Sequence, residues 1–245
     1  MDKLHQAFLR HFDILLADRH DLIDQAHALR HQIYCIENPF EPPQPGARER
    51  DAWDRRSVHS LVRHRDTGHA VGVVRLVLPD RAKPDAPFPL EVCCGQRLGR
   101  FPGDAWEVPR RSTAEISRFA VSKQVSERIS TPKCRTMEPQ HHFRPHITMG
   151  LFAAIVRMSA RHGVTHWFAM MEPTLLRLLT RFGVHFQVIG PTVEHRGGRV
   201  PALASVEDLL GRMLRERPDV WALATGEGQI RPAVCMDPEP ALATS

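Results

Sequence analysis

The sequence lacks any run of about eighteen uninterrupted apolar residues, the length that a membrane-spanning helix needs. Its first residues, Met1-Asp2-Lys3-Leu4-His5, also lack the basic and then apolar layout of a secretory signal. The two absences argue against a membrane protein and against a secreted one. We therefore expect a cytoplasmic chain without a transmembrane segment.

Cysteine is scarce, and its pattern excludes two common frameworks. The chain has 5 cysteines, an odd number without paired metal-type spacing, and Cys93 and Cys94 are adjacent. Neighbouring thiols rarely share a bridge or a metal without strain. The motif His141-His142-x-x-x-His146 lies between prolines and lacks both acidic neighbours and the HExxH spacing of a zinc helix. The sequence therefore predicts neither a disulfide framework nor a metal site.

Lysine is rare as well, since nearly all of the 33 basic residues are arginine, and they exceed the 28 acidic residues by only 5. So small an excess over a whole chain does not predict a nucleic-acid partner. Arginine pairs in bidentate fashion with carboxylates and phosphates. Codon bias would explain the preference for arginine, and a basic face for an acidic partner or a phosphorylated cofactor would explain it equally well.

The length of 245 residues allows one substantial domain with a buried core. In the first half, hydrophobic spacing and turn residues predict a mixture of strands with one helix. The expected elements are a strand at Phe12–Ala17, a helix at Arg19–Tyr34 capped by Asp18, a proline-containing loop at Asn38–Gly46, a hairpin of Ser57–Arg65 with Ala70–Leu78, and a strand at Ala114–Val121.

The second half alternates helices with strands. The expected elements are helices at Ile147–Arg161, at Pro173–Phe182 and from the Ser205 cap to Arg217, and strands at Thr165–Met170, His185–Ile189 and Arg199–Ala204. This order predicts an α/β fold with a mixed sheet. We expect one domain at residues 1–220, and a poorly ordered tail at residues 221–245.

Four charged motifs interrupt this pattern. They are Arg30 within the first helix, Glu49-Arg50-Asp51-Ala52-Trp53-Asp54 after the proline-containing loop, Arg75 within the apolar run Val71–Leu78, and Glu115-Ile116-Ser117-Arg118. A charge in a half-buried strand needs a partner or solvent, so Arg75 is expected to pair with Asp51, Asp54 or Glu115, or to face water. Glu115 and Arg118 are three residues apart and would face opposite sides of a strand unless it bulges.

This ordered set resembles the acyl-homoserine-lactone synthases and the N-acyl amino acid synthases, and most closely the acyltransferases associated with the exosortase protein-sorting system. The resemblance spans roughly Phe12 to Ser205. It implies a GNAT-like fold, in which a mixed central sheet is flanked by helices. It also implies an ion-pair cluster beside the acceptor site, made of Arg30, Asp51, Asp54, Arg75, Glu115 and Arg118.

The activity implied is attack by an amine on an acyl thioester. A carboxylate, or a water held by one, must take the amine's proton, and we expect Glu115 to act as this base, with Asp54 as the second candidate and Arg118 beside them. Amides near a bulge at Phe119–Val121 would stabilise the oxyanion. The expected substrate-binding residues are Arg30, Tyr34, Asp51, Arg75, Phe119 and Val121. A nucleophilic Cys35 paired with His31 is the competing mechanism.

The expected acyl donor depends on a segment in which this sequence departs from the pattern of the GNAT enzymes. GNAT enzymes that use coenzyme A carry a glycine-containing phosphate loop after the bulged strand, whereas Ser122–Ser130 contains no glycine. The departure favours acyl carrier protein, with its 4'-phosphopantetheine thioester, over acyl-CoA, and no permanently bound cofactor is expected. Lys123, Arg128 and Arg157 are expected to contact the carrier.

Three alternatives stay open at this level: an acyl-homoserine-lactone synthase acting on S-adenosylmethionine, a coenzyme A-dependent N-acetyltransferase, and a binding module for a carrier protein or a lipid. The helix after Ile147 and the pair Met170-Met171 could build core or line an acyl tunnel. We expect core.

Overall fold

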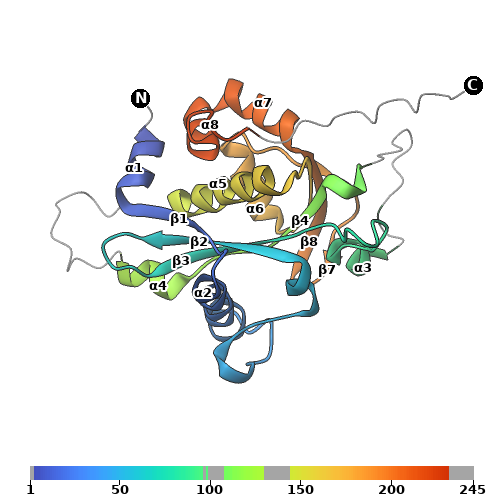
Figure 1. Cartoon of the computed structure of the whole chain (residues 1–245), viewed down its shortest axis with the longest axis horizontal. Coiled ribbons are helices and arrows are strands. Elements are labelled where there is room, and N and C mark those ends of the chain that lie inside the picture. Colours follow the sequence, from blue (N-terminus) through green and yellow to red (C-terminus); the bar gives the residue numbers. More distant parts are fainter. Residues whose placement is uncertain (1–2, 96–97, 99–107, 130–143, 232–245) are drawn as a thin grey trace, which may run out of the picture.

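An eight-stranded mixed sheet runs through the centre of the protein (Figure 1). The computed structural model describes residues 3–95, 98, 108–129 and 144–231. The strands are β1 (Phe12–Leu16), β2 (Ser57–His64), β3 (Ala70–Val77), β4 (Thr113–Val121), β5 (His166–Met171), β6 (Gln187–Val188), β7 (Val193–Glu194) and β8 (Gly198–Ser205). Their order is β1-β2-β3-β4-β5-β8-β6, and β7 pairs with β8. The β4–β5 pair is parallel, while the other pairs are antiparallel.

Helices cover both faces of this sheet (Figure 1). They are α1 (Lys3–His11), α2 (His20–His31), α3 (Pro89–Cys94), α4 (Lys123–Ile129), α5 (Arg144–His162), α6 (Pro173–Arg181), α7 (Val206–Glu216) and α8 (Pro218–Thr225). Helices α5, α7 and α8 lie on one face, and α2 lies on the other. No helix in the described part of the chain is both long enough and apolar enough to cross a membrane.

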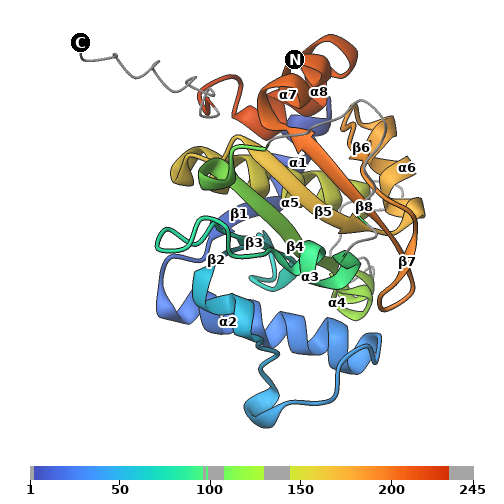
Figure 2. The same cartoon turned by 90° about the vertical axis from the view of Figure 1, so that its right-hand side faces the viewer.

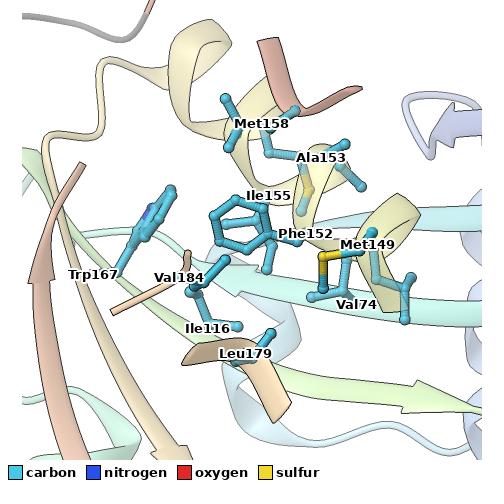
Figure 3. Close-up of a cluster of buried hydrophobic side chains, with 14 of the residues drawn as sticks. Val74, Ile116, Met149, Phe152, Ala153, Ile155, Met158, Trp167, Leu179 and Val184 are labelled. Carbon is cyan, nitrogen blue, oxygen red and sulfur yellow. The ribbon is translucent and has the colours of Figure 1, made fainter. Parts of the chain in front are cut away.

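The main core lies between α5 and the sheet (Figure 3). The Phe152 ring meets the Trp167 ring edge to face, with the centroids 5.8 Å apart. The indole nitrogen of Trp167 donates a hydrogen bond to Ser159 Oγ at 2.8 Å, so the one polar atom of this ring is satisfied inside the core. Burying a large apolar side chain stabilises the fold by about 1.5–3 kcal/mol. The core therefore fixes the position of α5 over the strands that carry the site.

Gly150 allows α5 to approach α1 closely. A Cβ atom at this position would lie 2.3 Å from Cε2 of the buried Phe8 ring. We expect Gly150→Ala to lower the free energy of unfolding by about 1–3 kcal/mol, because overpacking a core forces side chains and backbone to shift. Gly211→Ala on α7 is the matched control, since its nearest neighbour would be 3.9 Å away. Chemical denaturation that showed equal effects of the two changes would contradict this account.

The structure confirms the predicted hairpin, which pairs β2 with β3, and the predicted strand at β4. It also confirms the Ser205 cap, whose side chain accepts a hydrogen bond from the Asp208 amide. The predicted Asp18 cap is wrong. Arg19 occupies the cap position of α2 without a side-chain cap bond, and the Asp18 carboxylate pairs with Arg161 at 2.9 Å instead. An exposed ion pair thus replaces the expected cap.

Other boundaries also differ from prediction. The first helix was expected to continue to Tyr34, but α2 ends at His31 and the chain continues as a π-helical turn at Gln32–Glu37. The π-helical turn follows α2 directly, so Tyr34 and Arg30 lie on one continuous helical segment. Helices α1 and α3 were not predicted, and α3 lies within the proline-rich stretch after β3.

The predicted end of the domain at residue 220 is too early. Helix α8 crosses this position, and its Val220 and Leu223 side chains are buried in the main core. Apolar residues at helical spacing after Pro218 explain why this segment folds onto α5 rather than remaining a tail. Residues 232–245 lie outside the described part of the chain.

Candidate active site

Strand β4 contains an irregularity at Arg118. Val73 pairs with Ala120 and Arg75 with Ser117, so two residue steps on β3 face three on β4. Arg118 has a φ of 51°, in the left-handed region that non-glycine residues rarely adopt. These are the features of a β-bulge. The bulge predicted for this strand is therefore confirmed, and Glu115 and Arg118 line the same cavity.

The sheet opens beside this bulge. The parallel pairing of β4 with β5 begins at Thr113↔His166 and ends at Ile116↔Ala169. Beyond that point β4 continues to Val121 along β3, while β5 continues to Met171 along β8. Figure 2 shows the two strands diverging. The gap lies in the middle of the sheet and borders the bulged segment.

An ion-pair cluster lies at one side of the gap. Arg30 from α2 donates to Asp54 at 2.6 and 3.1 Å and also bonds Glu49. Arg75 from β3 donates to Asp51 at 2.6 Å and to Asp54 at 2.8 Å. Arg118 from β4 donates to Glu49 at 2.8 Å and to Asp51 at 3.0 Å. We call these six residues the Arg-carboxylate cluster: Arg30, Glu49, Asp51, Asp54, Arg75 and Arg118.

The local sequence explains how the acidic loop holds its shape. Asp51 accepts a hydrogen bond from the Trp53 amide at 2.9 Å, and Asp54 accepts one from the Asp51 amide at 2.8 Å. This reciprocal capping box fixes the short helical turn Ala52–Arg56. The Glu49 amide donates to the His27 carbonyl of α2 at 3.1 Å. Both carboxylates of the Asp-x-x-Asp spacing therefore face the arginines.

The cluster is buried and remains charged. The Arg30 side chain is fully buried, and Glu49 is 1% exposed. Burial opposes the ionisation of Glu49, but hydrogen bonds from Arg118 and Arg30 overcome it and lower its pKa to about 2. Burial likewise opposes ionisation of Asp54, yet Arg30 and Arg75 hold its pKa below the ordinary value. Both carboxylates are therefore anionic at neutral pH.

Glu115 lies outside these ion pairs. The prediction that Arg75 pairs with Asp51, Asp54 or Glu115 is confirmed for the two aspartates, which Arg75 bonds together with Ser117. The Glu115 carboxyl is buried and accepts a hydrogen bond from the Leu90 amide of α3 at 2.7 Å. Burial raises its pKa to about 8, although the Leu90 bond and Arg75 act in the opposite direction. Glu115 is therefore mostly protonated at neutral pH.

A cavity of about 330 Å³ passes through the gap and joins two different environments. Its polar end is lined by Tyr34, Asp51, Trp53, Arg75, Glu115, Ser117, Arg118, His195, Arg196 and Arg199. Its apolar end is lined by Ile116, Phe152, Ile155, Ala169, Met170, Met171, Leu175, Leu179 and Phe186. The expectation that the residues of α5 and the methionine pair build core is confirmed, and several of them also line this cavity.

Most of the predicted binding residues meet at this cavity. Tyr34 lies under the Arg118 guanidinium, 5.2 Å from ring centroid to Cζ, and Phe119 lines the wall. Val121 instead packs against the main core, so its side chain has no direct place in the site. Cys35 is buried, accordingly has a raised pKa, and is not a lining residue. The cysteine mechanism therefore gains no support from the geometry.

The three residues predicted to contact the carrier differ in their exposure to solvent. Lys123 and Arg128 are exposed on α4. Arg157 is half-buried on α5, its Nε is buried without a hydrogen-bond partner among the described residues, and burial lowers its pKa. Arg157 is therefore a poor candidate for a carrier contact.

Two buried histidines behind Asp54 were not predicted. His59 Nε2 lies 3.6 Å from Asp54 and His27 Nε2 lies 4.0 Å from it. Burial lowers the pKa of His59 to about 3, and it lowers that of His27 as well, so both rings are neutral. The three groups are close enough to share a metal ion. Arg30 already bonds both oxygens of Asp54, however, and its charge disfavours a cation here.

Three further polar lining residues were also missed, namely His195, Arg196 and Arg199. The only signal for them in the sequence is the turn His195-Arg196-Gly197-Gly198, where a charged residue precedes two glycines. The predicted motif His141-His142 lies outside the described residues.

Comparisons with known proteins agree with this geometry. Residues 29–131 match the family model of the acetyltransferase (GNAT) domain. The AHL synthase LasI superposes with a TM-score of 0.55 at 17% identity, over 79% of this chain and 88% of LasI. FeeM, an N-acyl amino acid synthase from uncultured soil microbes, superposes with a TM-score of 0.53 at 10% identity, over 83% of this chain and 94% of FeeM.

A third solved structure, the CoA-dependent acyl-homoserine lactone synthase BjaI with SAM and isopentyl-CoA, has a TM-score of 0.54 at 20% identity, over 88% of this chain and 98% of BjaI. No curated protein sequence matches the chain. The domain match at residues 29–131 and the architecture show the GNAT fold, so the predicted fold class is confirmed. The match to an acetyltransferase domain supports the predicted enzyme class.

Proposed function

We propose that the protein transfers a fatty acyl group from the thioester of acyl carrier protein to the amine of an amino acid or a similar small acceptor. The observation that carries this proposal is the single cavity through the β4–β5 gap, which joins an apolar end to an arginine- and carboxylate-lined end. Such a cavity accommodates a long apolar group and a small polar molecule so that they meet at the bulged strand.

The apolar end suits a fatty acyl chain. Phe152 and Ile155 of α5 lie within the core that Figure 3 shows, and Leu179 of α6 closes the same region. Each methylene group that moves from water into such surroundings contributes about 0.8 kcal/mol. An acetyl group would leave most of this wall unused, which favours a longer chain over N-acetyl transfer.

Chain length is open to a direct test. Leu179 is 3% exposed and lines the apolar end. We expect Leu179→Trp to shorten the preferred acyl chain by about two carbon atoms, because the added side-chain volume must come out of the cavity in a close-packed interior. Kinetics with donors of graded length would measure the shift, with Leu214→Trp at an exposed position of α7 as the control. An unchanged preference would place the acyl chain elsewhere.

The polar end supplies the groups for amine attack. The acceptor nitrogen bonds to the thioester carbonyl carbon, the carbon–sulfur bond breaks, and the departing sulfur takes a proton. The amine must lose its own proton, and the ionised form of Glu115, with a pKa of about 8, is well matched to receive it. Asp54 is a weaker base because its pKa is lowered and its oxygens are bonded to arginines. We assign Asp54 to holding Arg30 and Arg75 in place.

We propose that amides of the bulged segment Phe119–Val121 stabilise the oxyanion that forms during attack. The support is their position on the strand edge that borders the gap. A bulge redirects backbone donors away from the regular ladder, and preorganised donors of this kind commonly supply the largest electrostatic contribution to acyl transfer.

The start of α4 supports a carrier-protein donor over coenzyme A. Glu37 accepts hydrogen bonds from the Lys123 amide at 2.7 Å and from Ser122 Oγ. Amides at a helix start are the usual partners of a bound diphosphate, and here the chain's own carboxylate holds them. A carrier protein presents its thioester on a 4'-phosphopantetheine arm without the coenzyme A diphosphate. The exposed Lys123 and Arg128 would face its acidic surface.

The decisive experiment incubates the purified protein with acyl carrier protein and coenzyme A thioesters of the same acyl chain, each with a panel of amino acids and with S-adenosylmethionine. Mass spectrometry of N-acyl products and release of free thiol are measured together. N-acyl amino acids formed from the carrier thioester would support the proposal. Formation of an acyl-homoserine lactone from S-adenosylmethionine would instead favour the alternative that the protein is an acyl-homoserine-lactone synthase. Binding of the donor without thiol release would indicate a binding module.

The setting of this activity is part of the proposal. We propose that the protein works in the cytoplasm, where acyl carrier protein is found, and in association with the exosortase protein-sorting system. The support for that association is the ordered motif set of Arg30, the acidic loop, Arg75 and Glu115–Arg118. Deleting the gene in an exosortase-containing host and comparing the acylated amino acids of its lipid extracts would test it.

A further inference from the structure

An arginine outside the Arg-carboxylate cluster also lines the same cavity. Arg196 lies in the turn between β7 and β8 and lines the polar end. Its φ of 54° is left-handed. A glycine adopts this conformation without strain, but an arginine does so at a free-energy cost of order 1–3 kcal/mol. Arg118 and Arg196 are the two described lining residues, glycines included, with such a backbone.

Arg196 is held by a carboxylate from another part of the chain. Its guanidinium contacts Glu41 in the proline-containing loop, and the same Glu41 oxygen lies 3.5 Å from Arg118 Nη2. Arg118 has closer partners in Glu49 and Asp51, at 2.8 and 3.0 Å. Glu41 therefore lies between two arginines but is the principal partner of Arg196 alone.

The surroundings of Arg196 favour an anion at this point. The side chain is 26% exposed. Burial lowers its pKa, and the charges of Arg199 and Arg30 act in the same direction, while Tyr34 opposes them. Arg199, its neighbour on β8, pairs with Glu172, whose side chain is half exposed and therefore screened by solvent. Removing Glu41 would leave a two-arginine recess open to the cavity.

We propose that the acceptor binds through a carboxylate that takes the place of Glu41 between Arg196 and Arg118. This inference rests on the proposed function and specifies its acceptor as an amino acid with a free carboxylate, not a simple amine. Exchanging one carboxylate for another leaves the charge of the site unchanged, so no extra charge is buried. The ammonium end of the same zwitterion then lies in the cavity that Glu115 and Asp51 line.

The test compares each L-amino acid of a panel with its carboxamide, which retains the amine and the side chain but lacks the anion. With one acyl thioester as donor, the wild-type protein should use the amino acid with a kcat/KM at least tenfold higher. Arg196→Met should raise the KM for the amino acid at least tenfold while leaving the KM values for the carboxamide and the donor unchanged. Glu41→Gln should lower the KM for the amino acid severalfold, because the internal competitor is gone.

Arg212→Met is the matched control, since Arg212 is exposed on α7 and pairs with Glu216. Circular dichroism melting of each variant would show that it folds. Equal use of amino acid and carboxamide by the wild-type protein would overturn this inference while leaving acyl transfer to amines intact. If no amine were acylated, the proposed function would fail. Calorimetric measurement of amino-acid binding would then still test whether a carboxylate binds at Arg196. Binding that Arg196→Met does not weaken overturns the inference.

Discussion

Arg30→Met should lower the free energy of unfolding by about 3–5 kcal/mol, the usual cost of leaving buried partner charges uncompensated. Arg30 is fully buried and bonds both Glu49 and Asp54. Methionine keeps much of the volume but none of the five donors of arginine. The two carboxylates would retain Arg118 and Arg75, so the protein should fold with reduced stability. Urea denaturation monitored by tryptophan fluorescence measures the loss.

Two companion variants make this expectation specific. Arg19→Met removes an exposed pair with Asp21 and should change the stability by less than about 1 kcal/mol. Adding Glu49→Gln to Arg30→Met should recover part of the loss, because one of the two buried carboxylates that have lost Arg30 is then neutral. If Arg30→Met were no more damaging than Arg19→Met, the Arg-carboxylate cluster would not stabilise the fold.

Glu115→Gln should reduce kcat/KM by about 10²–10⁴-fold, the range that a general base contributes. The sign of the pH dependence follows from its raised pKa of about 8. Only the ionised form accepts a proton, so wild-type kcat/KM should rise about tenfold per pH unit below 8 and level off above it. The pH profile of the variant should show only the ionisation of the acceptor amine. Both profiles should be measured with the same acceptor. A wild-type profile identical to the variant's would remove Glu115 from the reaction.

The same pKa predicts the stability of this variant and separates chemistry from misfolding. Because the folded-state pKa lies above the ordinary value of 4.5, the protonated carboxyl stabilises the fold below about pH 4.5, and this contribution is lost as the pH rises to about 8. Glutamine mimics the protonated form. Glu115→Gln should therefore be at least as stable as the wild type at pH 9, with exposed Glu207→Gln on α7 as the neutral control.

Local patterns in the sequence predicted much of the sheet. The turn Asp66-Thr67-Gly68 and the apolar runs beside it identified the β2–β3 hairpin, and an arginine inside one of those runs indicated a charged partner. That reasoning works because alternation and turn chemistry act over a few residues. The partner of Arg118 could not be derived in the same way, since Glu49 lies 69 positions away and pairing at that distance depends on the complete fold.

The nature of Glu115 shows why the site was predicted less fully than the sheet. Its pKa depends on burial and on the Leu90 amide of α3, a short helix within a stretch of prolines and weak periodicity. The sequence alone suggested Glu115 as the general base, and gave it as one of three candidate partners of Arg75. Likewise, Arg196 is one charged residue in a glycine turn, and only the closure of β8 against β5 brings it to the cavity.

Where β4 and β5 separate, β4 has a strand edge in the middle of the sheet without a partner among the described strands. An exposed edge strand usually invites pairing with another chain and promotes aggregation. Within the described residues, the β4 edge past Ile116 borders the cavity of about 330 Å³ instead. A pantetheine arm contains two amide groups, so it can lie along this edge as a short additional strand. Under the proposed function, recognition of the arm would then reside in the main chain of β4, and side-chain substitutions there should alter which acyl group is transferred before they alter whether a carrier arm binds.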